Sequence, residues 1–348
     1  MNLILTKEGN HMKYLVTDSS DIRYNLALET YLMEHANLDE PILYFYINSP
    51  CIILGRYQDA YEEINQEYVK KHNIIVTRRT SGGGAVYDDL GNVSFSFITK
   101  DDGDSIGNFL KFTDPVIKAL HKLGATDAEM SGRNDLQING KKFSGNAMKT
   151  EKGRMFSHGT LMYDVDLDVI GKALNVPADK IASKGIKSVH SRVTNLKPFF
   201  KPEYQNLTIE EFRDTLAKTI LGVDDLADAK EYELDDETKK AVEQLNQSIF
   251  SNWDWIYGKS PKAAIQHRQH FTQGTVDFRI TLEDGRIKGL KTYGDFFGQK
   301  AIDEFEKKLI GVRYDEQAIK GALKDVQISD YFGKIPESDI LDLLLRQE

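Results

Sequence analysis

The amino-acid sequence predicts a mixed α/β (α+β) fold, with a large N-terminal domain followed by a smaller α/β domain. Short apolar runs of strand length alternate with longer segments whose apolar residues recur at helical spacing. The chain has 348 residues, of which 40% are hydrophobic, so it is long enough to bury two cores. We expect the first domain to cover residues 1–245 and the second to cover residues 246–348.

A helix followed by two strands is expected at the start of the first domain. Residues 22–36 carry apolar side chains at helical spacing, and Asp21 precedes them as an N-cap. The apolar runs at residues 42–47 and 51–54 have the length of buried strands, with a polar turn between them. These segments predict the first helix of the domain and the first strands of its sheet.

Further elements continue this alternation through the first domain. Strands are expected over residues 73–77 and 93–98. Helices are expected over residues 61–72 and 109–123, the second of which is closed by Gly124. A sheet with helices packed against it is the arrangement that such an alternation favours.

An acidic segment separates the two expected domains. Residues 224–237 contain few large apolar side chains, and the helical residues 238–251 lead away from them, which places the boundary near residue 245. The alternative is a solvated helical arm within one domain. The second domain is expected to contain two strands joined by a turn at residues 283–285, then two helices, over residues 274–282, 287–293, 300–309 and 338–346.

Composition excludes several classes of protein. The net charge of −9 argues against a protein that coats nucleic acid, because binding to backbone phosphates requires a basic surface. The single cysteine, Cys51, excludes an internal disulfide and a multi-cysteine metal site, and it suits a reducing compartment. No apolar run approaches the roughly 20 residues that span a bilayer, so we expect a soluble, cytoplasmic protein that binds neither nucleic acid nor membrane.

Residues 78–87 form the most informative segment, with the sequence Arg-Arg-Thr-Ser-Gly-Gly-Gly-Ala-Val-Tyr. Glycine tolerates positive φ, so backbone N–H groups in this turn can approach a phosphate while the arginines supply positive charge. The segment matches neither common nucleotide fingerprint, because position 87 is tyrosine and no G-x-x-x-x-G-K-[ST] occurs. A glycine-rich hairpin with solvated arginines is the alternative interpretation.

Polar clusters also stand at three other loops or strand ends, at residues 55–58, at residues 132–135 with 141–147, and at residues 158–161. Between the two parts of the second cluster, Asn139 and Gly140 form a strong signal for a two-residue hairpin turn. This turn places Lys142 just inside the returning strand. Together with the glycine-rich segment, these clusters are the candidate site.

The four clusters resemble the motifs of lipoate-protein ligases, in order along the chain. The family patterns R-R-x-S-G-G-G-A-V, G-R-N-D-L followed by K-x-S-G-x-A, H-G-T-L, and G-I-x-S-V-x-S-R-V-T-N-L are matched, the last at residues 185–196. The resemblance extends through residues 253–261 and 294–297, so it covers nearly the whole chain. One departure is Asp88, where many relatives have histidine, whereas Asp89 keeps the acid that follows.

The resemblance implies a catalytic domain with the fold of biotin ligases and class II aminoacyl-tRNA synthetases, and a mobile C-terminal accessory domain. It also implies a reaction in two steps that uses ATP, Mg²⁺ and lipoate. Lipoate attacks the α-phosphorus of ATP to give lipoyl-AMP, and a lysine of a lipoyl-domain protein then takes the lipoyl group. The implied acceptors are the E2 subunits of 2-oxo-acid dehydrogenases and the glycine-cleavage carrier.

Position in the family motifs assigns residues to each substrate. Lys142 is expected to be the central catalytic cation, which draws the lipoate carboxylate toward phosphorus and later faces the carbonyl oxygen. The residues expected to bind ATP are Arg79, Gly84, Ala85, Val86, Tyr87 and Lys142. The residues expected to bind lipoate are Lys142, Arg79, Gly83 and His158. For His158, orientation of the substrate carbonyl and a structural role at a strand end are alternatives.

Two more assignments concern the metal and the closure of the site. Asn134 and Asp135 offer the hard oxygen ligands that suit Mg²⁺ beside phosphates, although Asp135 is equally suited to stabilise the hairpin turn. Residues 184–195, with Lys184 and Arg192, are expected to close over the adenylate and keep water away from it. A solvated loop is the alternative for this segment.

Three other functions compete with this one. An acyltransferase of the same superfamily carries the octanoyl or lipoyl group on a cysteine without ATP, and Cys51, inside an apolar run, is the sole candidate. A biotin ligase would resemble G-R-G-R-x-G at the phosphate loop, which this chain lacks. A non-catalytic lipoate-binding module would keep the pocket but release no pyrophosphate when given lipoate and ATP.

Overall fold

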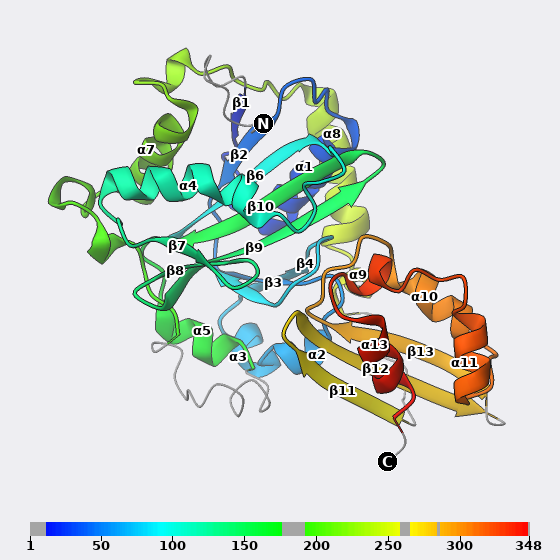
Figure 1. The fold of residues 1–348 in the computed structure, drawn as a ribbon. Helices are drawn as coiled ribbons and strands as arrows, with labels where there is room; N and C mark the ends of the chain where they lie inside the picture. The colour runs from blue at the N-terminus through cyan, green and yellow to red at the C-terminus, as the bar shows by residue number, and fades with distance from the viewer. Residues whose placement is uncertain (1–11, 176–191, 258–264, 284–285, 347–348) are drawn as a thin grey trace.

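The computed structural model describes residues 12–175, 192–257, 265–283 and 286–346 (Figure 1). These residues form a large N-terminal unit built on two sheets and a smaller C-terminal unit built on a third. Strands and helices alternate along the chain, so the mixed α/β fold expected from the sequence is confirmed. None of the described helices combines the length and the apolar character that crossing a bilayer requires.

The central sheet has seven strands in the order β1-β2-β6-β10-β9-β8-β7. β1 pairs with β2 in parallel, whereas the other pairs in this sheet are antiparallel. Asn139 and Gly140 have φ angles of 50° and 75°, so the expected hairpin turn between β8 and β9 is confirmed. The strands are β1 (Lys13–Val16), β2 (Ile42–Tyr46), β6 (Asn92–Lys100), β7 (Glu129–Ser131), β8 (Asp135–Ile138), β9 (Lys141–Glu151) and β10 (Arg154–Met162).

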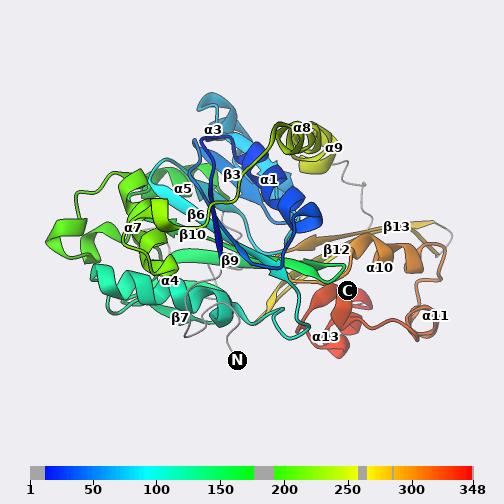
Figure 2. The ribbon, with the colours of Figure 1, turned by 90° about the horizontal axis from the view of Figure 1, so that it is seen from above.

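Helices cover both faces of this sheet, as Figure 2 shows from above. α4 and α7 share a core with Phe45 on one face, while α1 and α8 share a core with Tyr44 on the other. Side chains alternate along a strand, so these neighbours on β2 serve different cores. The helices are α1 (Ile22–His35), α4 (Phe109–Leu123), α7 (Ile209–Leu221) and α8 (Asp236–Leu245), with short turns η2 (Lys197–Phe199), η3 (Pro202–Tyr204) and η4 (Leu226–Asp228).

Capping residues set the ends of several helices. Asp21 caps α1 by accepting a backbone hydrogen bond, and Gly124 ends α4 with a φ of 119°, both as expected. The helix expected over residues 61–72 is two helices instead, because Asn65 accepts a backbone hydrogen bond and begins a new one. These two helices are α2 (Ala60–Glu63) and α3 (Gln66–Lys71).

A smaller sheet in the order β4-β3-β5 lies beside the central sheet, on the face that carries α1. Its strands are β3 (Cys51–Leu54), β4 (Ile75–Arg78) and β5 (Val86–Asp88), and α5 (Leu167–Ala173) lies near α3. The glycine-rich segment joins β4 to β5 within this sheet. The sequence does not predict β5, because its three residues are too few to show a strand period.

The C-terminal unit is an antiparallel sheet, β11-β12-β13, covered by α10 to α13. Its core is aromatic, with Phe278, Phe305 and Phe332 in mutual contact. The expected strands and helices are present, whereas β11, α11 and α12 were not predicted. Residues 284–285 of the expected turn lie outside the described residues. The elements are β11 (Ile265–Phe271), β12 (Gly274–Glu283), β13 (Arg286–Gly294), α10 (Ile302–Leu309), α11 (Glu316–Ala322), α12 (Ser329–Phe332) and α13 (Glu337–Leu344).

Between the two units, the chain runs from α8 through a π-helical turn, η5 (Asn246–Phe250), into α9 (Trp253–Ile256). These residues pack on the first unit. The carbonyl oxygen of Phe250 accepts a hydrogen bond from Thr77 Oγ1 at 2.8 Å, and that of Ile256 accepts one from Arg78 Nη2 at 2.6 Å. The division near residue 245 stays a prediction, and this packing supports a proposal that the C-terminal unit begins after α9.

The C-terminal unit sits directly on the glycine-rich segment. The rings of Tyr57 and Phe296 stack with their centroids 4.7 Å apart, and the guanidinium of Arg133 lies 4.4 Å from the ring centroid of Phe297. A Cβ added at Gly82 would lie 2.4 Å from the carbonyl oxygen of Phe296. The absence of a side chain at Gly82 therefore allows the two units to meet at this point.

We predict that Gly82→Ala destabilises the protein by about 1–3 kcal/mol, because the added Cβ overlaps backbone that has little freedom to move. Gly84→Ala is the matched control, since a Cβ at Gly84 meets no atom within 4 Å. Urea unfolding measures both variants. An unchanged free energy of unfolding in Gly82→Ala would show that the contact with Phe296 is not kept in solution.

Candidate functional site

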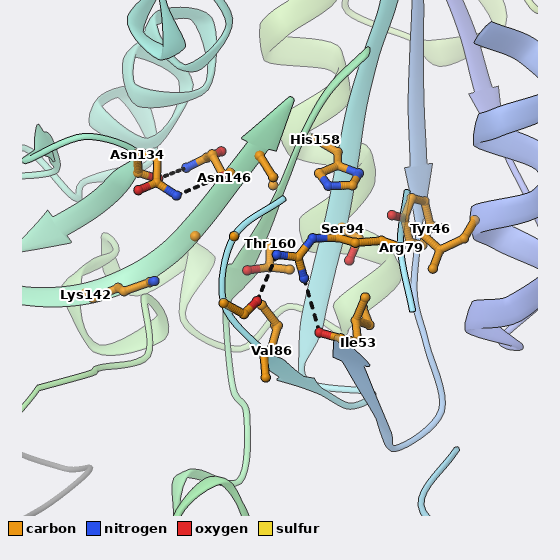
Figure 3. Close-up of a pocket in the computed structure, with 17 residues that line it drawn as sticks. Tyr46, Ile53, Arg79, Val86, Ser94, Asn134, Lys142, Asn146, His158 and Thr160 are labelled. Carbon is orange, nitrogen blue, oxygen red and sulfur yellow. Dashed lines mark hydrogen bonds between the residues drawn. The ribbon is translucent and has the colours of Figure 1, made fainter. Parts of the chain in front are cut away.

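A cavity of about 90 Å³ lies between the central sheet and the smaller sheet (Figure 3). It brings together Arg79, Lys142 and His158, as the motifs predict, whereas Tyr87 and Asp135 lie outside its lining. Strands β2, β6, β9 and β10 form one wall, and β3 and the glycine-rich segment form the other. The lining residues are Leu26, Tyr46, Ile53, Arg79, Gly83, Gly84, Ala85, Val86, Ser94, Asn134, Lys142, Gly145, Asn146, Ala147, His158, Gly159 and Thr160.

Arg79 is buried and holds the glycine-rich segment in shape (Figure 3). Its Nη2 donates to the carbonyl oxygens of Gly82 and Gly84, each at 2.8 Å, and its Nη1 donates to that of Ile53 at 3.1 Å. Burial lowers the pKa of Arg79 to about 10, so the guanidinium keeps its proton at neutral pH. Arg79 therefore places positive charge beside the cavity, while its N–H groups donate to backbone carbonyl oxygens.

Arg78 does not line the cavity and instead joins three segments of the chain. Its Nη1 donates to the carbonyl oxygens of Gly55 at 2.8 Å and Gln58 at 2.6 Å, and its Nη2 donates to that of Ile256 at 2.6 Å. Burial lowers the pKa of Arg78 to about 10 as well. The sequence suggests two arginines facing an anion, and the structure gives Arg78 the separate role of a cross-link between backbone segments.

Lys142 extends from β9 into the polar end of the cavity (Figure 3). Its Nζ forms an ion pair with Asp135 Oδ1 at 2.7 Å, and both side chains are about two-fifths exposed. The backbone N–H of Lys142 donates to the carbonyl oxygen of Arg192 at 2.8 Å, and its carbonyl oxygen accepts from Thr194 at 2.9 Å. The described end of the expected closing segment therefore lies beside Lys142, whereas Lys184 lies outside the described residues.

Asn134 and Asn146 hold the polar wall of the cavity through reciprocal hydrogen bonds. Asn134 Nδ2 donates to the carbonyl oxygen of Asn146 at 2.6 Å, and Asn146 Nδ2 donates to that of Asn134 at 3.0 Å. A Cβ added at Gly159 would lie 2.1 Å from Asn146 Oδ1, so the glycine of the H-G-T-L motif makes room for this side chain. The motifs do not single out Asn146, because it occupies a variable position of K-x-S-G-x-A.

His158 lies in the cavity wall with both ring nitrogens engaged. Its Nε2 is 3.0 Å from Ser81 Oγ, and its Nδ1 is 2.9 Å from Glu29 Oε2. Glu29 is only 1% exposed, and a carboxylate buried this deeply needs the partner that His158 provides. A role of His158 in orienting the substrate carbonyl stays a prediction. Glu29 was not predicted, although an acid three residues after Leu26, on the apolar face of the expected helix, was an available signal.

Asp88, at which the chain departs from the family pattern, is buried in a hydrogen-bonded group behind the cavity. Its Oδ2 accepts from Asn48 Nδ2 at 2.8 Å and from Ser94 Oγ at 3.1 Å. Its Oδ1 is buried and has no hydrogen-bond partner among the described residues. Burial raises the pKa of Asp88 to about 7, and the two hydrogen bonds act in the opposite direction.

The raised pKa of Asp88 makes stability depend on pH. The folded chain binds this proton more tightly than the unfolded chain, so the contribution to stability is complete below about pH 4 and is lost as the pH rises through about 7. We predict that Asp88→Asn, which does not ionise, reduces the fall in unfolding free energy between about pH 5 and about pH 8 by on the order of 2 kcal/mol. Urea unfolding at several pH values measures this, and equal pH slopes for both proteins would contradict it.

Cys51 lies in the same interior but does not line the cavity. It is fully buried on β3 opposite Asp88, and burial raises the pKa of its thiol. A thiol in this setting is a poor nucleophile, and the acyltransferase alternative has no other cysteine in the chain. Among the described residues, no group of three or more His, Cys, Asp or Glu side chains is arranged to hold a metal ion.

Both units match the models of one protein family. Residues 21–221 match the model described as the lipoyl protein ligase A/B catalytic domain. Residues 260–344 match the model described as the bacterial lipoate protein ligase C-terminus. The fold and the site thus define a ligase, and the chain belongs to the lipoate-protein ligase family.

One relative and two solved structures show how far the likeness extends. The chain is 47% identical over 325 residues to lipoate-protein ligase LplJ of Bacillus subtilis, covering 93% of this chain and 97% of the relative. P. falciparum LipL1 in complex with lipoate has a TM-score of 0.77 and 26% identity, covering 96% and 98% of the two chains. A lipoate-protein ligase A bound with ATP has a TM-score of 0.59 and 27% identity, covering 71% of this chain and 98% of its own.

Proposed function

We propose that this chain joins lipoate to protein in two steps, through lipoyl-AMP, at the cavity between its two sheets. The observation behind this proposal is that one cavity combines the Lys142 ammonium, the backbone of a glycine-rich segment and apolar side chains, those of Leu26, Ile53 and Val86. An acid that reacts at its carboxylate and carries an aliphatic tail needs this combination. Lipoate and ATP are bound in the two solved proteins that resemble this chain.

The lining of the cavity orients the acid. Lys142, Asn134 and Asn146 lie at one end, whereas Tyr46 and Ile53 lie at the other (Figure 3). We assign the lipoate carboxylate to the Lys142 end, because its negative charge is attracted to the ammonium group. The aliphatic tail and the dithiolane then lie toward the other end, and removal of their apolar surface from water favours binding.

The nucleotide is assigned to the backbone of residues 84–87, which are the last four residues of the glycine-rich segment. Amide N–H groups can follow phosphate and adenine edges closely, since no side chain stands between them. Arg79 engages the carbonyl oxygens of Gly82 and Gly84, each at 2.8 Å. Arg79 thus serves in this proposal as a positioning residue whose charge also favours the triphosphate and the carboxylate. Gly83 lines the cavity and is assigned to the acid, and its lack of a side chain leaves room for the Arg79 guanidinium, since a Cβ there would lie 2.7 Å from Nη2.

Lys142 serves both transition states. In the first step, a carboxylate oxygen forms a bond to the α-phosphorus while the bond from phosphorus to the bridging oxygen breaks, and pyrophosphate leaves. Both reactants are anions, so the ammonium lowers their repulsion. In the second step, a neutral lysine amine of the acceptor attacks the acyl carbonyl, AMP leaves, and the amine loses a proton. Negative charge develops on the carbonyl oxygen, which faces the same ammonium.

Asp135 is assigned to Mg²⁺, with Asn134 beside it. A carboxylate and an amide oxygen are hard ligands, and Mg²⁺ usually takes its other ligands from water and substrate phosphates. The Asp135 carboxylate is about two-fifths exposed, which leaves room for those ligands. The ion would supply neutralisation of phosphate charge. The charge of Asp135 meanwhile holds the Lys142 ammonium at 2.7 Å.

The proposed acceptor is a lipoyl domain, carried by E2 subunits of 2-oxo-acid dehydrogenases or by the glycine-cleavage carrier. Family membership supports this proposal, because a lipoate-protein ligase acts on a protein. Lys142 is about two-fifths exposed, so an acceptor lysine can approach it from solvent. We also propose that the reaction takes place in the cytoplasm, with no nucleic acid or membrane partner.

We predict that Lys142→Ala lowers the rate of lipoate-dependent pyrophosphate release by on the order of 10²–10³, because loss of one charge-stabilising donor costs about 3–4 kcal/mol. Lys141→Ala is the matched control, since Lys141 is an exposed neighbour on β9 that does not line the cavity. It should keep the unmutated rate. A coupled pyrophosphate assay with ATP, Mg²⁺ and lipoate measures both variants.

Other outcomes of this assay separate the alternatives. If Lys142→Ala releases pyrophosphate at the same rate as the unmutated protein, the role assigned to Lys142 is wrong. No lipoate-dependent pyrophosphate release from the unmutated protein would favour a non-catalytic lipoate-binding module. The mass of a lipoyl-domain acceptor, measured after incubation with the complete reaction mixture, tests the second step separately from the first.

We predict that Asp135→Asn raises the Mg²⁺ concentration needed for half-maximal rate several-fold, because an amide oxygen is a weaker ligand than a carboxylate. The substitution also removes the ion pair with Lys142, so the rate is compared at saturating Mg²⁺ as well. Pyrophosphate release as a function of Mg²⁺ concentration is the measurement. An unchanged Mg²⁺ dependence would leave Asp135 with its structural role in the hairpin.

A further inference from the structure

A buried network of hydrogen bonds lies behind the far end of the cavity, apart from the groups that the reaction uses. Asn25 Nδ2 donates to Asn48 Oδ1 at 2.9 Å, and Asn48 Nδ2 donates to Asp88 Oδ2 at 2.8 Å. Ser94 Oγ donates to the same oxygen of Asp88 at 3.1 Å. Each of these four residues is at most 1% exposed. Polar groups buried this deeply cost free energy unless they are paired, and these bonds pair the side chains of the network, with the exception of Asp88 Oδ1.

Ser94 is the member of this network that lines the cavity. It stands on β6 and is paired across the sheet with Tyr46, another lining residue. The hydroxyl proton of Ser94 is directed to Asp88, and its oxygen accepts from Asn92 Nδ2 at 3.3 Å. The hydroxyl is therefore engaged by the protein both as donor and as acceptor, and it does not offer its proton to a molecule in the cavity.

We propose that Asp88 is a specificity-determining residue, which acts by holding the proton of the Ser94 hydroxyl away from the acyl tail. The proposal rests on the proposed function, since it concerns the far end of the same cavity. Because the Ser94 hydroxyl donates its proton to Asp88, a hydrocarbon or dithiolane tail can lie against Ser94 without leaving that donor unpaired. A tail that carries an oxygen acceptor loses its water on entry and gains no donor from Ser94 in exchange.

The position of Asp88 suits this role. Asp88 follows Val86 by two residues on β5, so the two side chains share one face of the strand, and Val86 lines the cavity. A single carboxylate oxygen accepts both donors, from Asn48 and from Ser94. That oxygen can accept them whether the carboxyl is ionised or carries its proton on Oδ1. Asparagine at this position can keep both bonds through its carbonyl oxygen, whereas alanine keeps neither.

Adenylate formation with acids of equal chain length tests the proposal. Octanoate has a hydrocarbon tail, and a series of oxo-octanoates places one ketone oxygen at successive carbons of the distal half of the same chain. The selectivity is defined as kcat/KM of pyrophosphate release with octanoate, divided by the highest kcat/KM found with any of the oxo-octanoates. The variants are Asp88→Ala, Asp88→Asn, Ser94→Ala and the double variant of Asp88→Ala with Ser94→Ala. Ser96→Ala is the matched control, because Ser96 is buried two residues further along β6 and is not bonded to Asp88.

We expect Asp88→Ala to lower the selectivity about three- to tenfold, because the freed Ser94 hydroxyl can donate one hydrogen bond to the ketone. Asp88→Asn should keep the unmutated selectivity, since it still accepts from Ser94. Ser94→Ala and the double variant should also keep it, since neither retains a hydroxyl at residue 94. Ser96→Ala should not change it. A role of Asp88 in stability alone would not produce this pattern.

Two results would overturn the proposal. The first is unchanged selectivity in Asp88→Ala, and the second is an equal loss of selectivity in the double variant, which has no hydroxyl to free. If Asp88→Ala does not unfold cooperatively, Asp88→Leu replaces it, because leucine fills a similar volume and accepts no hydrogen bond. If the unmutated protein releases no pyrophosphate, the proposed function fails, and the ratio of dissociation constants from calorimetry still decides the role of Asp88.

Discussion

The hydrogen bonds from Arg78 and Arg79 to backbone carbonyl groups are the interactions on which the site depends. Arg79 holds the glycine-rich segment against β3, and Arg78 ties the turn after β3 to α9. A guanidinium offers five donors in a rigid plane, so one side chain can join several carbonyl groups at once. Burial disfavours both charges and lowers both pKa values to about 10, and the charge-assisted bonds offset that cost. The three glycines of the segment thereby keep one shape, although they have no side chains of their own.

Local signals in the sequence predict much of this architecture, because turn and cap chemistry depends on a few adjacent residues. Asn139 and Gly140 predict the hairpin that presents Lys142, and Gly124 predicts the end of a helix, since each needs only its own backbone conformation. The motifs likewise indicate which residues gather at the cavity, although they assign no bond between them. The resemblance to a family indicates which residues lie together at the cavity, whereas composition and periodicity alone do not.

The remaining features depend on contacts between distant parts of the chain. Glu29 and His158 are 129 residues apart, and Arg78 and Ile256 are 178 residues apart. No local pattern encodes such a pair, because the approach of the two residues depends on how whole sheets and helices pack. Asp88 stands out in the sequence only as a departure from a motif, and its hydrogen bond to Asn48, 40 residues away, becomes visible only in the folded chain. The contact of the C-terminal unit with Gly82 is of the same kind.

The interior between the two sheets is also polar for a protein core. His158 with Glu29, and Asp88 with its neighbours, occupy space that aliphatic side chains would fill in a core built for stability alone. Paired polar groups have fixed directions, so they hold the walls of the cavity more rigidly than interchangeable aliphatic side chains do. The arrangement exchanges some folding free energy for a binding site that is already shaped before its substrate arrives.

The contact of Phe296 with Gly82, together with that of Phe297 with Arg133, joins the small unit to the large unit beside the glycine-rich segment. Thermodynamic reciprocity then applies: if docking of the small unit changes the affinity of the cavity for a ligand by some factor, the ligand changes docking by that same factor. With such coupling, a spectroscopic label on an edge strand of the small unit, far from any reacting atom, would report which chemical species occupies the cavity of the large unit.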